Sequence, residues 1–353
     1  MNIFTGRSPA KRSRKEAPGL DAQKSWTPPR LRSVGCYWHA RIVSTAAHFQ
    51  LFDWLGTHAR TPGTVSSHFG GSPQDWDIFL NALAAMKLLR RRGNRYHNSR
   101  FALRYLRARQ ADFLLPDHDA WNHWGRLPDI LTNGNRPKVA QPFFTDRVKA
   151  ERLLHALDED GRKLAPYLIK RLPLSRSKRL LDVGGGLGTL AIACCQRYPK
   201  LRATIVEHPN VAPLTLCAVK KSRLKNRVEV LALDVLKDPW PVGFDAVLLS
   251  NILHGQGVRD SRALIAAAYD CLNPGGCLIV RDVLLGADRT TSAWGALFSV
   301  ALLVHTPRGR CHSLQEVREW LRQAGFSNLQ GPWGSSPVAF DPDSVLIAHK
   351  NQP

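Results

Sequence analysis

Short apolar runs alternate with amphipathic segments along the second half of the chain. Runs rich in Val, Ile and Leu predict strands near residues 179–183, 203–207, 228–233, 244–250 and 276–283. Apolar positions at helical spacing predict helices near residues 188–198, 210–222, 258–272 and 313–324. Strands that alternate with helices are typical of an α/β fold, so we expect a doubly wound sheet. Closing antiparallel strands are expected within residues 327–350, and an additional helix over residues 292–305.

The first third of the chain has a compact helical pattern between residues 37 and 106. Apolar residues recur there at near-helical intervals, at Ile42, Ala46, Phe49 and Leu55. A short capped helix is predicted over residues 64–69 and an apolar helix over residues 76–89. The basic stretch RRRGNRYHN follows, and its Gly93–Asn94 pair predicts a hairpin turn. Helices followed by a basic hairpin form the outline of a winged helix.

A glycine-rich loop follows the first predicted strand. The sequence RLLDVGGGLGT ends its apolar run in Asp182, and the spacing D-x-G-x-G-x-G places glycines at 184, 186 and 188. Because glycine has no Cβ, such a loop can turn tightly and lets a ligand approach the backbone. The free N–H groups at the start of the next helix then face that ligand. A dinucleotide fingerprint, G-x-G-x-x-A, can also be read from Gly186 to Ala191.

Carboxylates follow three of the predicted strands. Asp182 precedes the glycine loop, Glu207 ends the second strand and Asp234 ends the third. Because ligands collect at the carboxyl ends of the strands in a doubly wound sheet, the three acids should converge on one crevice. Negative charges there would repel a diphosphate and favour a sulfonium, an amino group or a ribose diol. The pattern therefore favours a nucleoside without a pyrophosphate.

Over residues 180–326 the chain resembles the class I S-adenosylmethionine-dependent O-methyltransferases of the caffeate and acetylserotonin type. The motifs that carry the resemblance are LLDVGGGLG, VEHP, LALDVL, DAVLLSNILH, LNPGGCLIVRDVLL and EWLRQAGF. The resemblance implies a Rossmann-like catalytic domain, S-adenosyl-L-methionine as the cofactor, and a small-molecule acceptor whose hydroxyl group receives the methyl group. It also implies an N-terminal winged-helix-like domain that forms a homodimer.

Site residues follow from the motifs and the resemblance together. The residues expected to bind the cofactor are Asp182, Gly184, Gly186, Gly188, Glu207, Asp234, Val235 and Ser250. By resemblance the additional helix roofs the substrate pocket, although a purely structural role is the alternative. The expected wall residues of that pocket are Trp124, Asn251, Trp294, Phe298, Leu302 and His305.

A histidine and an aspartate are the expected catalytic pair. A phenolic acceptor with a pKa near 10 needs a base at neutral pH. His254, just past the 244–250 strand, lies where the resemblance places the catalytic histidine of the family. Asp282, at the end of the next strand, matches a family glutamate that orients this histidine. We therefore expect His254 to act as general base and Asp282 to hold its ring.

The chain also departs from the family pattern. Where the family usually reads H-D-W, this sequence has His254-Gly255-Gln256, and a second family glutamate falls on Cys311. Fewer groups are therefore expected to orient the histidine than is usual. The acceptor is expected to differ from the plant phenols.

Two interpretations of the N-terminal region remain. Base readout needs polar, Arg or Asn side chains on an exposed recognition helix. The candidate, DWDIFLNALAAMKLL, is apolar almost all round, as is typical of a helix buried against a partner. The pattern therefore favours dimerisation over DNA reading.

We expect a basic arm over residues 1–33, the dimerisation domain over 34–110, a helical connector over 111–178 and the catalytic domain over 179–353. The connector should contain one helix in WNHWGRLPDIL and a long one over 147–172.

Composition sets the class of protein. The 353 residues suit two domains, and an apolar content of 44% is enough to build their cores. The formal net charge of +22 is uneven, because residues 1–110 hold 19 Lys or Arg against 5 Asp or Glu. This raises the expectation of a nucleic acid or another anionic partner. The arm itself, with KRSRK and four prolines, is more typical of a solvated tail, so a nucleic-acid partner is not expected.

Cysteine usage and apolar runs bear on location. The seven cysteines form no C-x-x-C pair and no metal-like spacing, which indicates reduced thiols, no bound metal and a cytoplasmic protein. No apolar run reaches 18 residues, so a membrane span is not expected. The N-terminus lacks the apolar core of a signal peptide.

Three other functions compete with O-methylation. A nucleic-acid methyltransferase would fit the charge, but the fourth strand ends in SNIL rather than N-P-P-Y, and no Pro-Cys pair occurs. A winged-helix regulator would bind DNA without turnover. A non-methylating relative would use the cofactor site to support decarboxylation or hydroxylation.

Overall fold

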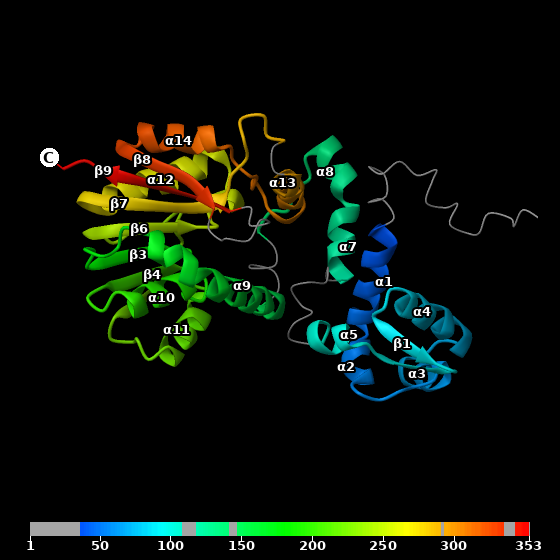
Figure 1. The fold of residues 1–353 in the computed structure, drawn as a ribbon. Helices are drawn as coiled ribbons and strands as arrows, with labels where there is room; N and C mark the ends of the chain where they lie inside the picture. The colour runs from blue at the N-terminus through cyan, green and yellow to red at the C-terminus, as the bar shows by residue number, and fades with distance from the viewer. Residues whose placement is uncertain (1–35, 108–117, 141–146, 291–292, 335–342, 353) are drawn as a thin grey trace, which may run out of the picture. The chain divides into compact units, whose positions relative to one another are not determined.

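The computed structural model describes residues 36–107, 118–140, 147–290, 293–334 and 343–352 (Figure 1). The chain divides after Arg107 into two compact units, and each is described by itself. The basic arm predicted at residues 1–33 lies outside the described residues. The predicted domain boundaries at 33, 110 and 178 stay predictions.

The first unit consists of short helices and one hairpin. Its elements are α1 (Cys36–His48), α2 (Leu51–Leu55), α3 (Pro62–Phe69), α4 (Pro73–Ala85), β1 (Leu89–Arg92), β2 (Arg95–Asn98) and α5 (Arg100–Tyr105). Thr61 caps α3 by accepting a hydrogen bond from the Thr64 N–H, and Ser72 caps α4 in the same way from Asp75. The predicted hairpin is present, because β1 and β2 pair in antiparallel register around Gly93–Asn94.

The apolar helix predicted over residues 76–89 is shorter than expected. It ends at Ala85, and Lys87 adopts a left-handed conformation with a φ of 61°. The Leu88 N–H then bonds to the Leu83 carbonyl at 3.0 Å, which closes the helix end. The apolar pattern of the sequence continues past Ala85 because Leu89 is also buried, but it is buried as the first residue of β1 and not as part of the helix.

The second unit is built on a seven-stranded sheet with the order β5-β4-β3-β6-β7-β9-β8. The strands are β3 (Arg179–Val183), β4 (Arg202–Glu207), β5 (Val228–Ala232), β6 (Phe244–Ser250), β7 (Leu272–Val283), β8 (Phe326–Gly334) and β9 (Asp343–Lys350). β3 to β7 run parallel, and β9 pairs antiparallel with β7 and β8. β7 begins four residues earlier than predicted, because Leu272 already pairs with Phe244.

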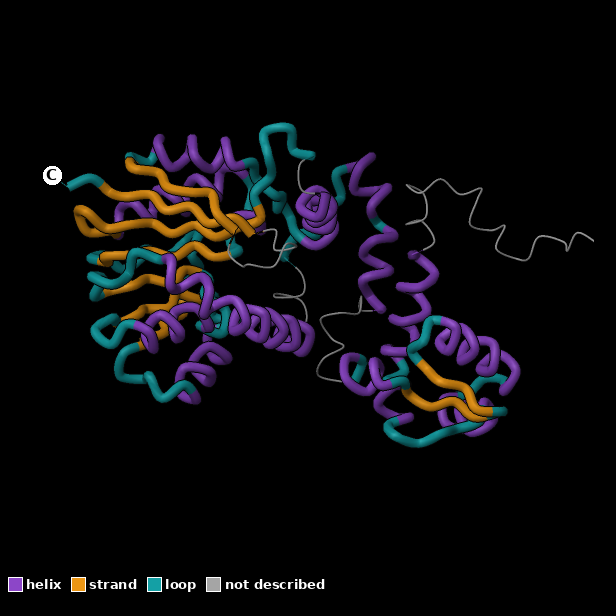
Figure 2. Tube along the Cα trace, in the orientation of Figure 1, coloured by secondary structure: helices purple, strands orange, loops and turns teal. Residues whose placement is uncertain are grey.

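Helices cover both faces of the sheet. Figure 2 shows the strands in orange with purple helices on either side of them. One face carries α9 (Arg147–Leu168), α10 (Thr189–Arg197) and α11 (Ala212–Lys221). The other carries α12 (Val258–Cys271) and α14 (Leu314–Gln323). An apolar core fills each interface. The predicted doubly wound α/β fold is therefore confirmed.

Strand order reverses between β3 and β6, and this places the site. The chain moves outward from β3 through β4 to β5 and then returns to β6 on the other side of β3. In such sheets the carboxyl ends at the reversal leave a crevice for a ligand. The glycine loop follows β3, and a one-turn 3-10 helix, η4 (Leu253–Gly255), follows β6.

Three further helices complete the second unit. They are α7 (His118–Gly125), α8 (Leu127–Asn133) and α13 (Ala293–His305), and both α7 and α8 pack against α13. The single helix predicted in WNHWGRLPDIL is in fact two, because Pro128 lies in the first turn of α8 and cannot continue a preceding helix. The long helix predicted over residues 147–172 is α9 followed by a 3-10 turn, η3 (Ile169–Arg171).

Candidate functional site

The glycine loop is held in place from two neighbouring elements. The Gly186 N–H donates to Glu207 Oε2 at 2.7 Å, and the Gly186 carbonyl accepts from Thr215 Oγ1 of α11 at 2.6 Å. Gly188 has a φ of 78°, and a Cβ there would lie 2.5 Å from Ile205 Cδ1. A larger residue at 188 would therefore force the loop away from the sheet. Sequence reasoning missed Thr215, because a threonine inside an apolar helix gives no signal until α11 is placed beside the loop.

Glu207 ends β4 and points its carboxylate at this loop. Oε2 accepts from Gly186 and Oε1 accepts from the His208 N–H at 2.7 Å. Burial raises the pKa of Glu207, while the two backbone donors act in the opposite direction. Each carboxylate oxygen keeps a second lone pair, so Glu207 retains the capacity to accept hydrogen bonds from a diol.

Asp182 lies beneath the loop. Its side chain is 2% exposed, and a Cβ on Gly185 would lie 2.8 Å from Asp182 Oδ2. Burial raises the pKa of Asp182 to about 7, and the negative charge of Glu207 adds to the effect. The structure thus brings Asp182 and Glu207 together as predicted. Asp182 therefore lies against the loop backbone, and its role in cofactor binding stays a prediction.

Asp234 lies two residues beyond β5. Its Oδ1 accepts from the Leu236 N–H at 3.1 Å, and Oδ2 pairs with Lys237 Nζ at 2.6 Å. The hydrogen bond from Lys237 lowers the pKa of Asp234, and the nearby His208 contributes to the same direction. His208 adjoins Glu207, so Asp234 belongs to the same end of the sheet. This carboxylate is ionised and partly exposed.

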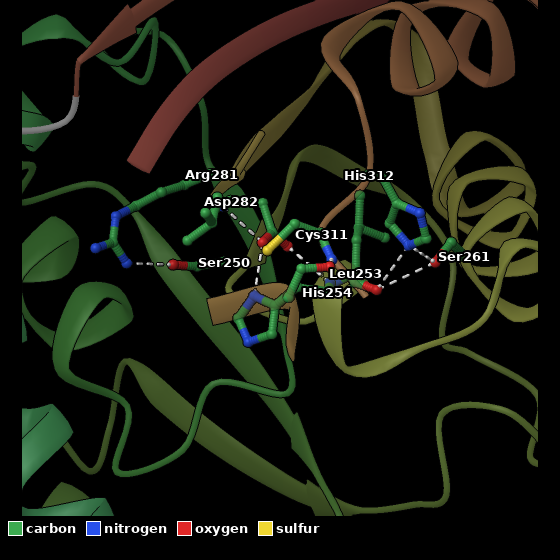
Figure 3. A network of polar contacts seen from close by, with 10 residues as sticks. Ser250, Leu253, His254, Ser261, Arg281, Asp282, Cys311 and His312 are labelled. Carbon is green, nitrogen blue, oxygen red and sulfur yellow. Dashed lines mark hydrogen bonds and ion pairs between the residues drawn. The ribbon is translucent and has the colours of Figure 1, made fainter. Parts of the chain in front are cut away.

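Val235 and Ser250 are the remaining residues predicted to bind the cofactor. Val235 is partly buried against the core beneath α12 and α14, and its carbonyl accepts from Trp240 Nε1 at 3.0 Å. Ser250 is the last residue of β6, and its Oγ accepts from Arg281 Nη1 of β7 at 3.2 Å (Figure 3). Arg281 was not predicted, although it directly precedes Asp282 in the motif LNPGGCLIVRDVLL.

His254 and Asp282 form a short, buried ion pair in the polar network of the second unit (Figure 3). The distance from His254 Nδ1 to Asp282 Oδ1 is 2.6 Å, and the side chains are 16% and 1% exposed. Asp282 Oδ2 also accepts from the Leu253 N–H at 2.9 Å and the His254 N–H at 3.3 Å. Burial alone would raise the pKa of Asp282, but the charge and hydrogen bond of His254 hold it below its usual range.

The ionised carboxylate determines the tautomer of the ring. A carboxylate accepts hydrogen bonds and cannot donate them, so His254 Nδ1 carries the proton. In the neutral ring, Nε2 therefore carries the lone pair. Asn251 shapes the approach to this turn, because its left-handed conformation (φ 55°) reverses the chain between β6 and η4.

Aromatic rings from α13 lie next to the histidine. Phe298 contacts His254 edge-to-face, with ring centroids 5.1 Å apart, and Trp294 stacks on Phe298 at 4.8 Å. His305 contacts His123 of α7 edge-to-face at 5.3 Å, and burial lowers the pKa of His305. Trp294 and Phe298 thus lie beside His254, and their role as walls of a substrate pocket stays a prediction.

Two predicted wall residues have other surroundings. Leu302 is buried with Val283, Leu285 and Cys311, so its contacts are with the core. Trp124 is 40% exposed on α7.

The described ranges contain no group of three or more His, Cys, Asp or Glu side chains placed to hold a metal ion. None of the described helices is long and apolar enough to cross a membrane.

Comparison with known proteins identifies the family. The model of the O-methyltransferase domain matches residues 143–327, more than half of the chain. The chain belongs to the O-methyltransferase family. The resemblance read from the motifs is confirmed, and the protein is an S-adenosylmethionine-dependent O-methyltransferase.

Relatives of this O-methyltransferase match it over most of their length. The 3-hydroxy-5-methyl-1-naphthoate 3-O-methyltransferase of Streptomyces sahachiroi is 29% identical over 311 residues, which cover 86% of this chain and 90% of the relative. The tetracenomycin polyketide synthesis 8-O-methyl transferase TcmO of Streptomyces glaucescens is 29% identical over 330 residues, covering 91% and 96%. A solved O-methyltransferase family protein from Burkholderia thailandensis has a TM-score of 0.79 at 26% identity and covers 92% of this chain and 97% of its own.

Replacing Glu207 with Ala should weaken binding of S-adenosylhomocysteine, the demethylated cofactor, at least about tenfold, or about 1.4 kcal/mol. The expected reason is the loss of a carboxylate that can accept both hydrogen bonds of a ribose diol. Isothermal titration calorimetry measures the affinity. Thr215→Val is the matched control, because it also removes a hydrogen bond to Gly186 but no proposed cofactor contact. Equal losses in both variants would assign the effect to the loop and not to a Glu207–ribose contact.

Asp182 should make the ligand-free protein less stable as the pH rises. Folding raises the pKa of Asp182 from 3.8 to about 7, so its stabilising contribution is complete below pH about 4 and is lost as the pH rises through about 7. This group can change the free energy of unfolding by at most about 1.4 kcal/mol per pH unit. Asp182→Asn should flatten the decline in the free energy of unfolding between pH 5 and 8, measured with urea. The exposed Asp270→Asn serves as control, and an unchanged decline in Asp182→Asn would contradict this.

Proposed function

We propose that this protein transfers the methyl group of S-adenosylmethionine to a hydroxyl group of an aromatic small molecule, with His254 as the general base. The observation that carries the proposal is the 2.6 Å contact between His254 Nδ1 and the ionised, buried Asp282. That contact leaves Nε2 as the proton acceptor of a neutral ring. A base of this kind is what a hydroxyl acceptor needs at neutral pH.

The residues around the glycine loop fit the cofactor. Gly184, Gly186 and Gly188 leave space for close approach to the backbone, and Glu207 and Asp234 supply carboxylates at the same sheet edge. The pair of acids favours a cation and a ribose diol over a diphosphate. Bound there, S-adenosylmethionine supplies an electrophilic methyl group on a sulfonium.

The protein's own groups then complete the transfer. His254 Nε2 takes the proton of the acceptor hydroxyl as the acceptor oxygen bonds to the methyl carbon and the bond from that carbon to sulfur breaks. The products are a methyl ether, a thioether and an imidazolium. Asp282 offsets the positive charge that forms on His254, because its carboxylate contacts the ring directly. Alignment of oxygen, carbon and sulfur contributes further, worth several kcal/mol in well-oriented reactions.

The acceptor is proposed to be a phenol on a flat ring system. Trp294 and Phe298 present stacked aromatic rings beside His254, a surface suited to a planar ligand. Two relatives, named for a hydroxynaphthoate and for tetracenomycin polyketide synthesis, support this choice. A panel of hydroxynaphthoates and other phenols, incubated with the labelled cofactor, tests it. Methylation of amines alone would contradict it.

We also propose that residues 34–110 form a homodimer. In the described part of this region Trp38 is 72% exposed and Ile78 is 64% exposed. A mainly apolar hollow of about 360 Å³ lies between α1 and α4, lined by Ile42, Ile78, Phe79 and Ala82 together with the acidic Asp75. A second copy of the chain would cover this surface, since large apolar patches on soluble proteins mark interaction sites.

His254→Ala should lower turnover by about 10² to 10⁴, the usual contribution of a general base, with cofactor affinity retained. The pH–rate profile of the wild type should show an acid limb that the variant lacks. Asp282→Asn should lose less, because the ring remains but its preferred tautomer and orientation are no longer enforced. Full turnover with an unchanged profile in His254→Ala would place the base elsewhere or remove deprotonation from the reaction.

Light scattering at micromolar concentration should give the mass of a dimer. Ile78→Arg should shift the protein toward monomer, because it places a charge in the apolar surface that the partner would cover. Leu131→Arg, at an exposed apolar residue of the second unit, is the matched control. A wild-type monomer, or a dimer unaffected by Ile78→Arg, would count against this interface.

A further inference from the structure

A second histidine holds the turn that carries the proposed base. His312 is 1% exposed, and its Nε2 lies 3.1 Å from the Leu253 carbonyl and 3.0 Å from Ser261 Oγ. Ser261, which is fully buried on α12, donates from Oγ to the same carbonyl at 3.2 Å. Figure 3 shows both side chains meeting at Leu253, on the far side of the turn from Asp282. His254 is the next residue of the chain.

The protonation of His312 follows from its contacts. The Leu253 carbonyl accepts hydrogen bonds and cannot donate, so His312 Nε2 carries the proton. The opposite tautomer would bury an Nδ1–H that makes no hydrogen bond within the described residues, which is costly. Burial lowers the pKa of His312, and the charge of Arg310 adds to this. His312 is therefore a neutral hydrogen-bond donor.

The Leu253 peptide is fixed from both sides. Its N–H donates to Asp282 Oδ2 at 2.9 Å, and its carbonyl accepts from Ser261, His312 and the Gln256 N–H within the turn. A 3-10 helix of three residues has few hydrogen bonds of its own and depends on such outside contacts. Three donors on one carbonyl, two of them from the buried side chains of Ser261 and His312, leave this peptide little freedom to rotate.

The segment that carries His312 makes a second contact with the turn. The Arg310 N–H donates to the His254 carbonyl at 2.9 Å. Gly309 permits this approach, because a Cβ there would lie 2.7 Å from the same carbonyl oxygen. The carbonyls of Leu253 and His254 are thus both held by residues 309–312, while the N–H groups of both are held by Asp282.

We propose that His312 and Ser261 are positioning residues for methyl transfer. By holding the Leu253 carbonyl they fix the backbone from which His254 projects, and so aim Nε2 at the acceptor hydroxyl. Neither side chain is exposed enough to touch the acceptor, so both act through His254. This inference rests on the proposed role of His254 as general base.

The test uses His312→Leu, His312→Gln and Ser261→Ala in the full-length protein. His312→Leu removes the donor with a similar volume, and it should lower kcat about tenfold, since small misplacements of catalytic groups are costly. The KM for a hydroxynaphthoate and the Kd for S-adenosylhomocysteine should change less than about twofold. His312→Gln keeps an N–H donor and should retain kcat within about threefold of the wild type.

Ser261→Ala guards against misfolding, because it removes one hydroxyl and leaves the packing nearly intact. Like His312→Leu, it should lower kcat. Its thermal unfolding should still show the single transition of a folded protein. Ser44→Ala is the matched control: Ser44 is also buried and donates to a backbone carbonyl, that of Arg41, within the first unit. Ser44→Ala should keep full activity.

The decisive comparison repeats Ser261→Ala and His312→Leu in a His254→Ala background. If the two residues act through His254, neither should reduce the residual turnover further. An equal loss with and without His254 would overturn the proposal, as would unchanged kcat in both single variants. Full turnover of His254→Ala itself would instead reject the general base, so the two failures are distinguishable.

Discussion

The buried carboxylate of Asp282 is the group on which the arrangement of His254 and its turn depends. It accepts hydrogen bonds from the Leu253 N–H, the His254 N–H, His254 Nδ1 and the Val283 N–H. These donors come from η4 and from β7 itself, so one side chain joins the ends of two parallel strands. The carboxylate is almost fully enclosed, and these donors together with the charge of His254 hold its pKa below the usual range. The orientation and the tautomer of His254 both follow from that charge.

A second buried acid plays a comparable role on the cofactor side. Asp182 lies beneath the glycine loop, and Glu207 holds the loop from the side through the Gly186 N–H. The negative charge of Glu207 adds to burial in raising the pKa of Asp182, and Asp182 is the more deeply buried of the pair. Asp182 thus lies against the loop backbone, while the carboxylate of Glu207, at the end of β4, has lone pairs beyond those that accept from Gly186 and His208.

The sequence predicted the frame of the catalytic unit closely because its signals are local. Glycine spacing, apolar strands and the position of acids at strand ends all lie within short stretches, and β3 and β6 have the predicted bounds. The proximity of His254 and Asp282 was also predictable, since His254 follows β6 and Asp282 lies near the end of β7, the adjacent parallel strand. The roles given to the site residues remain proposals.

The features that sequence could not show depend on contacts between distant segments. Thr215, Ser261 and His312 are a threonine, a serine and a histidine without motif spacing, and their partners are 29, 8 and 59 residues away. Leu302 was predicted to line the pocket from the position of its helix alone, and sequence did not show that it is buried with Val283, Leu285 and Cys311. α4 ended early because of a left-handed residue at Lys87, which apolar periodicity does not reveal.

The central claim is that Asp282 holds His254 as a neutral base with its lone pair on Nε2. The ¹⁵N NMR signals of the His254 ring, in protein bound to S-adenosylhomocysteine at neutral to mildly basic pH, test this most directly. The structure predicts a protonated Nδ1 and an unprotonated Nε2. The opposite tautomer, with the proton on Nε2, would contradict the account, because the ring would then have no lone pair to receive the proton of the acceptor.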